Sequence, residues 1–118
     1  MKARRTIESL VGEELNTVAF VMDYVEFHFN GPVLRAFTAP RVSPGTDLPT
    51  FPEPGSRDVL CTLIGASVQA VEVRDEEHIR LDFADGRSLT IPLDFASRVG
   101  PEAATFQGEL IHSALDVW

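Results

Sequence analysis

Cysteine is scarce in this sequence: Cys61 is the single example among 118 residues. One cysteine excludes an intramolecular disulfide, which favours a reducing, cytoplasmic location. A chain of this length can bury a core without disulfides or metal, so we expect one domain over residues 1–118. Cys61 lies between Leu60 and Leu63 with no neighbouring base. This setting predicts a buried structural cysteine rather than a reactive one.

Long apolar runs are also missing. The start, Met1 to Arg5, is basic, but Glu8, Glu13 and Glu14 interrupt the residues that follow it. This pattern predicts neither a signal peptide nor a membrane span, so we expect no membrane partner.

Positive charge is scarce relative to negative charge. Ten Lys and Arg residues stand against 18 Asp and Glu residues, giving a formal net charge of −8. An acidic surface repels phosphate backbones, so we expect no nucleic-acid partner. The same charge keeps a protein in solution and speeds its association with a basic partner.

Catalytic motifs are absent as well. No serine stands in a Gly-x-Ser-x-Gly setting, and the glycines occur singly, without a phosphate-binding loop. We therefore assign no catalytic residue and expect no cofactor.

What the sequence does contain is an internal repeat. A first copy covers about residues 3–38 and a second about 56–93, separated by a proline-rich crossing (39–55) and followed by a tail (94–118). The apolar and glycine positions match with two small gaps: Ile7 with Leu60, Leu10 with Leu63, Gly12 with Gly65, Leu15 with Val68, Phe27 with Leu81, and Leu34 with Leu89. A repeat of this kind constrains the fold.

Each copy predicts a short helix followed by three strands. In the first copy the helix spans 3–11 and ends at Gly12, and strands cover 16–22, 24–29 and 33–38. In the second, Ser56 is the expected N-cap, Gly65 ends the helix, and strands cover 67–74, with a bulge, 78–83 and 88–93. Five of the eight prolines fall in the crossing, which excludes regular structure there. The tail pattern leaves helix and strand open over 103–118.

The predicted fold class is α+β and mostly β. We expect a tandem duplication of a helix-strand-strand-strand unit, with pseudo-two-fold symmetry, that forms a strongly bent sheet or a small barrel.

Two polar groups are candidate metal ligands. Glu26 and His28 lie two apart on the outward face of one predicted strand, and Glu77 and His78 end the polar turn 75–78. Carboxylate and imidazole groups bind divalent metals, but no third ligand stands at a fixed spacing, and a surface His on a half-solvated strand is the better explanation of the first pair.

Aromatic residues at predicted edges, loops and termini form a candidate interaction surface: Tyr24, Phe37, Phe51 and Trp118. Exposed aromatics near a proline-rich segment are typical of partner-binding patches. The alternative is that the crossing segment folds over the core and buries them.

Residues Arg57 to Gly65, the Asp85-Gly86 turn, Gly100 to Ala104 and the closing Val117-Trp118 resemble a set of small uncharacterised bacterial proteins. This resemblance covers nearly the whole chain. It implies a bacterial, single-domain cytoplasmic protein of unassigned activity, and it implies no functional residues.

From these features we expect a non-enzymatic binding module that has a protein partner or self-associates, for example as a homodimer. One specific form is an immunity-type protein that blocks a basic toxin. The alternative is a small metal-binding protein or hydrolase that uses the Glu26/His28 strand face or the Asp75–His78 turn.

Overall fold

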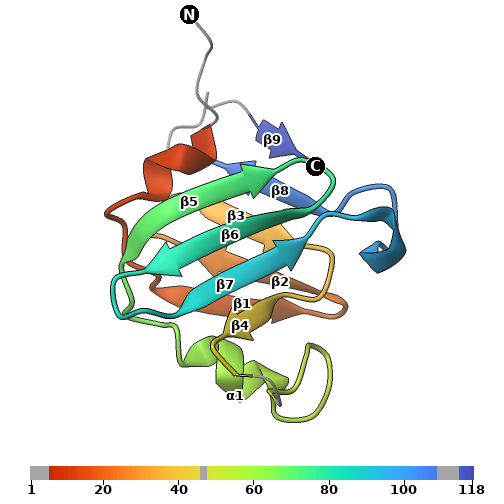
Figure 1. Ribbon diagram of the computed structural model, residues 1–118, viewed down its shortest axis with the longest axis horizontal. Helices are drawn as coiled ribbons and strands as arrows, with labels where there is room; N and C mark the ends of the chain where they lie inside the picture. Colours follow the sequence, from red (N-terminus) through yellow and green to blue (C-terminus); the bar gives the residue numbers. More distant parts are fainter. Residues whose placement is uncertain (1–5, 46–47, 109–114) are drawn as a thin grey trace, which may run out of the picture.

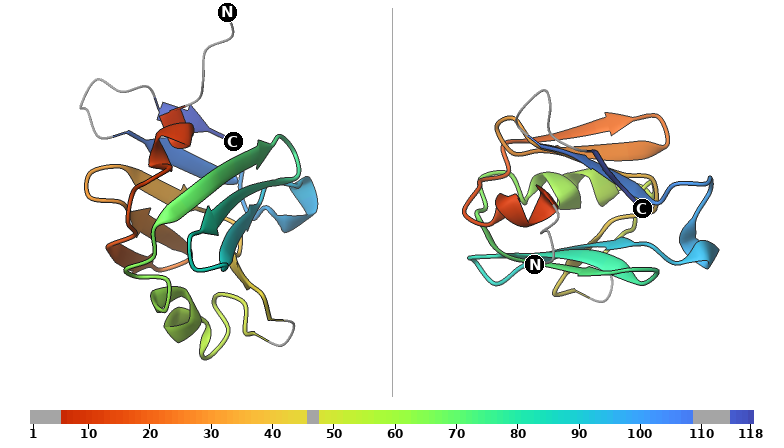
Figure 2. Two further views of the ribbon diagram at one scale, coloured as in Figure 1. Left: turned by 60° about the vertical axis from the view of Figure 1, so that its left-hand side comes forward. Right: turned by 90° about the horizontal axis from the view of Figure 1, so that it is seen from above.

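The computed structural model describes residues 6–45, 48–108 and 115–118. They form two antiparallel sheets packed face to face, with a short helix at each of two opposite edges (Figure 1 and Figure 2). One sheet has five strands in the order β1-β2-β3-β8-β9, and the other has four in the order β4-β7-β6-β5. The prediction of a mostly β fold is confirmed.

The first half of the chain contributes η1 (Thr6–Leu10), β1 (Thr17–Val21), β2 (Tyr24–His28), β3 (Val33–Ala36) and β4 (Arg41–Ser43). The second half contributes α1 (Ser56–Cys61), β5 (Val68–Arg74), β6 (His78–Phe83), β7 (Ser88–Pro92), η2 (Phe95–Ser97), β8 (Ala104–Gln107) and β9 (Leu115–Val117). The predicted bulge is present as a register shift between Val68 and Ala70.

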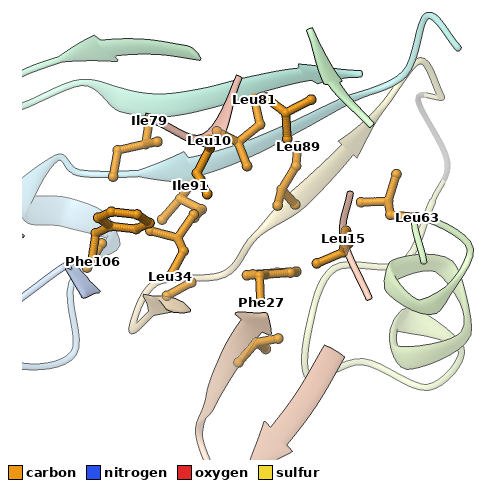
Figure 3. Packing of buried hydrophobic residues seen from close by; sticks show 14 of the residues in the cluster. Leu10, Leu15, Phe27, Leu34, Leu63, Ile79, Leu81, Leu89, Ile91 and Phe106 are labelled. Carbon is orange, nitrogen blue, oxygen red and sulfur yellow. The ribbon is translucent and has the colours of Figure 1, made fainter. Parts of the chain in front are cut away.

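Strict alternation along the central strands produces the core. In β2, Val25 and Phe27 point inward and are fully buried, whereas Glu26 and His28 point outward. The inward side chains of the two sheets point toward one another and fill the space between the sheets (Figure 3). Such burial of apolar surface is the main favourable term in folding.

The fourth strand of each half pairs with the opposite sheet. β4 follows β3 along the chain but pairs with β7, with Val42 opposite Leu89. β8 follows β7 but pairs with β3, with Phe106 opposite Leu34. Each sheet therefore contains strands from both halves: the four-stranded sheet includes β4, and the five-stranded sheet includes β8 and β9.

Backbone hydrogen bonds join the two halves of the chain, between residues 12–15 after η1 and residues 65–68 after α1. The Gly12 N–H donates to the Val68 carbonyl and the Gly65 N–H to the Leu15 carbonyl, both at 2.8 Å. Leu15 N donates to Ala66 O at 3.0 Å, and Val68 N donates to Glu13 O at 2.8 Å. These bonds satisfy backbone groups that the helix ends leave unpaired.

The expected barrel does not form in the described part of the chain, where the two sheets remain separate. The helices explain why. η1 contacts β5 and β8, and α1 contacts β1 and β4. At each open side of the sandwich, a helix lies where strands of the two sheets would have to pair to close a barrel.

Three local expectations were wrong. The proline-rich crossing contains β4, whose three residues fit between Pro40 and Pro44. Gly55, with φ at 88°, caps α1, and Ser56 is buried in the first turn. Cys61 is exposed, because α1 buries Leu60 and Leu63 and these positions leave Cys61 on the outer side of the helix.

In the tail, residues 104–107 and 115–117 are strands, which decides the open alternative for those positions; residues 109–114 lie outside the described residues. Among the helices of the described ranges, none has the length and apolar character needed to cross a membrane.

Candidate functional site

A groove lies at one corner of the sandwich, where the β1–β2 turn and the η2 segment project on the same side of the molecule (Figure 1 and Figure 2). It consists of two adjoining hollows of about 240 and 290 Å³ that share Asp23, Phe37 and Val99. The first is completed by Gly100, Pro101 and Glu102, and the second by Thr38, Ala39, Phe51, Pro52 and Ser97. We call this surface the corner groove.

The first wall of the corner groove is the turn between β1 and β2. Val21 pairs with Tyr24, so Met22 and Asp23 form the turn. Met22 has φ at 45°, in the left-handed region, and its side chain is 93% exposed. Glycine and asparagine normally occupy such a position, because other side chains are strained there.

The floor is aromatic. Phe37 follows β3 directly, and its ring lies 5.1 Å from the ring of Tyr24. A hydrogen bond of 2.8 Å from Phe37 N to Ala103 O fixes the backbone at this point. Beneath the second hollow, Phe51 stacks on Phe20 with ring centroids 5.9 Å apart. These ring contacts hold the floor in one arrangement.

The second wall is the η2 segment between β7 and β8. The Arg98 guanidinium donates to Leu93 O at 2.9 Å and to Pro101 O at 3.1 Å, and it lies 4.7 Å from the centre of the Phe95 ring. Through these contacts, the Arg98 side chain holds the loop in its conformation. Val99 and Phe95 nevertheless remain 82% and 75% exposed.

Two of the four predicted interaction residues, Phe37 and Phe51, line the corner groove, and Tyr24 contacts Phe37 beside it. Phe51 lines it although only 5% of its surface is exposed. Trp118 does not line it. Trp118 ends β9, exchanges backbone hydrogen bonds with Ala103 and Ala104, and packs against the core.

Sequence reasoning did not find the residues of the two walls. Asp23 read as an ordinary turn residue, and Val99 and Glu102 flank a Gly-Pro break in a segment without periodicity. The available signal was the isolated apolar pair Phe95 and Val99 in an otherwise polar loop, which alone says nothing about proximity to Phe37.

The polar candidates lie elsewhere. On the outer face of the first sheet, His28 Nε2 lies 3.0 Å from Glu26 Oε1, and Arg35 Nε donates to Glu26 Oε2 at 2.7 Å. The Glu26 side chain is 16% exposed. The hydrogen bond from Arg35, followed by the one from His28, lowers the pKa of Glu26 below its ordinary value against the opposing effect of burial.

His78, from the second candidate pair, lies on the outer face of the other sheet, on the opposite side of the sandwich. There His78 Nε2 lies 3.3 Å from Glu72, which also accepts hydrogen bonds from Arg74 and Arg80. The two groups are not brought together. Within residues 6–45, 48–108 and 115–118, no set of three His, Cys, Asp or Glu side chains is arranged to hold a metal ion.

The Glu26–Arg35 pair predicts a specific pH dependence of stability. Because the pKa of Glu26 is lowered in the folded protein, its contribution is complete above the unfolded value, about 4.5, and is lost as the pH falls through the folded pKa. Urea unfolding at neutral pH and at several acidic values should therefore show a smaller acid-induced loss of stability in Glu26→Gln than in the wild type.

Arg35→Gln is the matched variant, because it removes the main cause of the lowered pKa while keeping Glu26. It should reduce the same acid-induced loss. Identical pH profiles in all three proteins would mean that this pair does not stabilise the fold.

Comparison of the chain with protein-family models, with curated proteins and with solved structures finds no match.

Proposed function

We propose that this protein is a non-enzymatic binding module whose partner docks at the corner groove. The observation that carries the proposal is the group of strongly exposed apolar side chains around the groove: Met22, Phe95 and Val99. Exposed apolar groups beside a hollow are typical of protein-interaction sites, because a partner removes them from water.

The backbone of the β1–β2 turn supports the same proposal. Met22 adopts a left-handed conformation that a glycine would adopt without strain. Its side chain contributes little to the fold, because it is almost wholly in solvent. A strained, exposed methionine is explained if its side chain serves binding, since methionine adapts to irregular apolar surfaces.

A comparison of the two halves points to the same corner. In the repeat alignment Asp23, Tyr24 and Phe37 correspond to Glu77, His78 and Pro92, so the second half has no aromatic pair at the matching place. The connection between β3 and β4 covers 37–40, whereas that between β7 and β8 covers 93–103 and includes η2. The groove is thus built from positions at which the halves differ, while the core positions are alike.

We further propose that the halves arose by duplication and are related by a pseudo-two-fold axis. The support lies in the hydrogen bonds between them. At the repeat offset, the bond from Gly12 to Val68 corresponds to the bond from Gly65 to Leu15, and the β2–β3 pair Phe27–Leu34 corresponds to the β6–β7 pair Leu81–Leu89. The exchange of β4 and β8 between the sheets follows the same symmetry.

A specific form of the proposed function is an immunity-type protein of the cytoplasm that blocks a basic toxin. The net charge of −8 supports it, because an acidic inhibitor and a basic target attract one another over distance.

The binding proposal is tested with an unbiased peptide-display library selected on the immobilised protein. We expect peptides whose affinity falls at least about tenfold on Val99→Asn, because an uncharged polar group in the groove opposes burial of apolar partner groups without adding charge. Ile64→Asn is the control, since Ile64 is also an exposed apolar residue but lies after the end of α1 and lines neither hollow. Peptides that bind both variants like the wild type would contradict the proposal.

A second copy of the chain is the other partner we expect. Sedimentation analysis decides this case: if the groove mediates a homodimer, Val99→Asn is monomeric at concentrations at which the wild type and Ile64→Asn are dimeric.

A further inference from the structure

We infer that the occupant of the corner groove is a basic segment of a partner protein, in which an arginine or lysine stands next to aliphatic or aromatic residues. This inference rests on the proposed function and specifies the chemistry of the partner.

The first argument is the charge of the walls. Asp23 projects from the β1–β2 turn and Glu102 from the end of the η2 segment, and both are exposed. Neither takes part in an ion pair within the described part of the chain. Two carboxylates on either side of an apolar floor attract a cation and are themselves stabilised by it.

The second argument is the placement of the cations. Among the described residues that line the two hollows there is no lysine or arginine. The nearby Arg98 donates to the carbonyls of Leu93 and Pro101 and covers Phe95, so its donors are directed into its own loop. Arg57 lies 5.2 Å from the centre of the Phe51 ring at the second hollow, but neither Arg57 nor Arg98 forms a described ion pair with Asp23 or Glu102. These two carboxylates are therefore left for a partner to neutralise.

Several carboxylates elsewhere on the surface have a different setting. Glu26 is paired with Arg35, Glu72 with Arg74 and Arg80, and Asp85 with Arg87. These groups have cations of their own. At the corner groove, carboxylates without such partners coincide with exposed apolar side chains.

The floor suits the same occupant. Phe37, in contact with Tyr24, lines the same hollow as the two carboxylates. A guanidinium or ammonium group over an aromatic face gains a cation–π interaction, and its aliphatic stem packs on apolar surface. Val99 and Met22 remain available for the apolar neighbours of that residue.

The size of the hollows favours side chains of a protein segment over a small molecule. The hollows measure about 240 and 290 Å³. Small-molecule sites usually measure about 300–1,000 Å³ and enclose most of the ligand. Two adjoining smaller hollows accommodate neighbouring side chains of one extended segment.

The test uses short synthetic peptides from the display selection and fluorescence anisotropy. The inference predicts that the selected sequences are rich in Arg or Lys, and that changing these residues to Gln weakens binding at least about tenfold. Affinity should fall with added salt, because the interaction is between exposed charges.

The protein variants give the complementary result. Asp23→Asn combined with Glu102→Gln should weaken binding of the basic peptide at least about tenfold. The matched control is Glu13→Gln with Glu14→Gln, which removes two carboxylates from the segment between η1 and β1 and should leave affinity unchanged at moderate salt.

The outcomes separate this inference from the proposed function. Peptides that require Val99 but are not basic, and that tolerate the Asp23/Glu102 variant, would overturn the inference and leave the binding function standing. Peptides that do not require Val99 would overturn both. Millimolar free arginine or spermidine could also displace the basic peptide. If either bound with the same affinity as the peptide, the groove would be a site for small cations and the inference would be overturned.

Discussion

Phe27→Ala is expected to lower the free energy of unfolding by about 3–5 kcal/mol. Phe27 lies in the middle of β2, is completely buried, and has Val18 and Leu34 as its neighbours on the two flanking strands. Its ring points into the space between the sheets (Figure 3). Removal of the ring loses its transfer from water and leaves a cavity that the rigid strands around it fill only in part. Urea unfolding followed by circular dichroism measures the loss.

Two variants calibrate this result. Phe27→Leu places in β2 the residue that β6 carries at the corresponding position, Leu81, and should cost less than half as much. Met22→Ala truncates a side chain that is 93% exposed and should change stability by less than about 0.5 kcal/mol. A loss below about 1 kcal/mol for Phe27→Ala would contradict the packing of this core.

The success of the sequence in predicting the strands has a simple physical reason. β2 and β6 are central strands with one face in the core and one in water, and this environment forces the strict alternation seen at Val25 to His28 and at Ile79 to Asp82. The turn after β2 contains Asn30-Gly31, both at positive φ, a dipeptide that is typical of tight hairpin turns.

The sequence did not predict how the strands pair. β4 and β8 are too short to show a clear alternation of apolar and polar residues. The sequence around Val42 and Phe106 also does not indicate that these strands pair with the opposite sheet. Long-range pairing depends on which faces remain uncovered after the hairpins form. A closed barrel was one of the two expected forms, because the sequence does not indicate that η1 and α1 lie at the open sides of the sandwich.

The corner groove lies beyond single-sequence reasoning for a related reason. Tyr24 and Phe37 were singled out as aromatics at predicted strand ends, but their contact with each other appears only in the structure. Asp23, Val99 and Glu102 are ordinary residues whose meaning comes from being neighbours, and the segments that carry them are far apart in the chain. The Glu26–His28 pair, by contrast, was found in the sequence, but its partner Arg35 appears only in the structure, across the β2–β3 hairpin.

The second large effect concerns the joint between the halves. Gly12→Ala and Gly65→Ala should each lower the free energy of unfolding by about 1–2 kcal/mol, and the double variant by about 2–4 kcal/mol. Gly12 follows η1 and Gly65 follows α1, with φ at +92° and +97°, where an L residue is strained. A Cβ at either position meets no atom within 4 Å, so strain of the backbone is the whole cost, and it should be the same at both.

Gly100→Ala is the control, because its Cβ also meets nothing within 4 Å but its backbone is not left-handed; urea unfolding should find it within about 0.5 kcal/mol of the wild type. Equal costs at Gly12 and Gly65 would support the proposed duplication, since each N–H donates to the segment that follows the other helix. A full loss at one glycine and none at the other would mean that the two helix ends are not energetically equivalent. The symmetry proposed for the halves would then describe their backbone path but not the forces that hold them together.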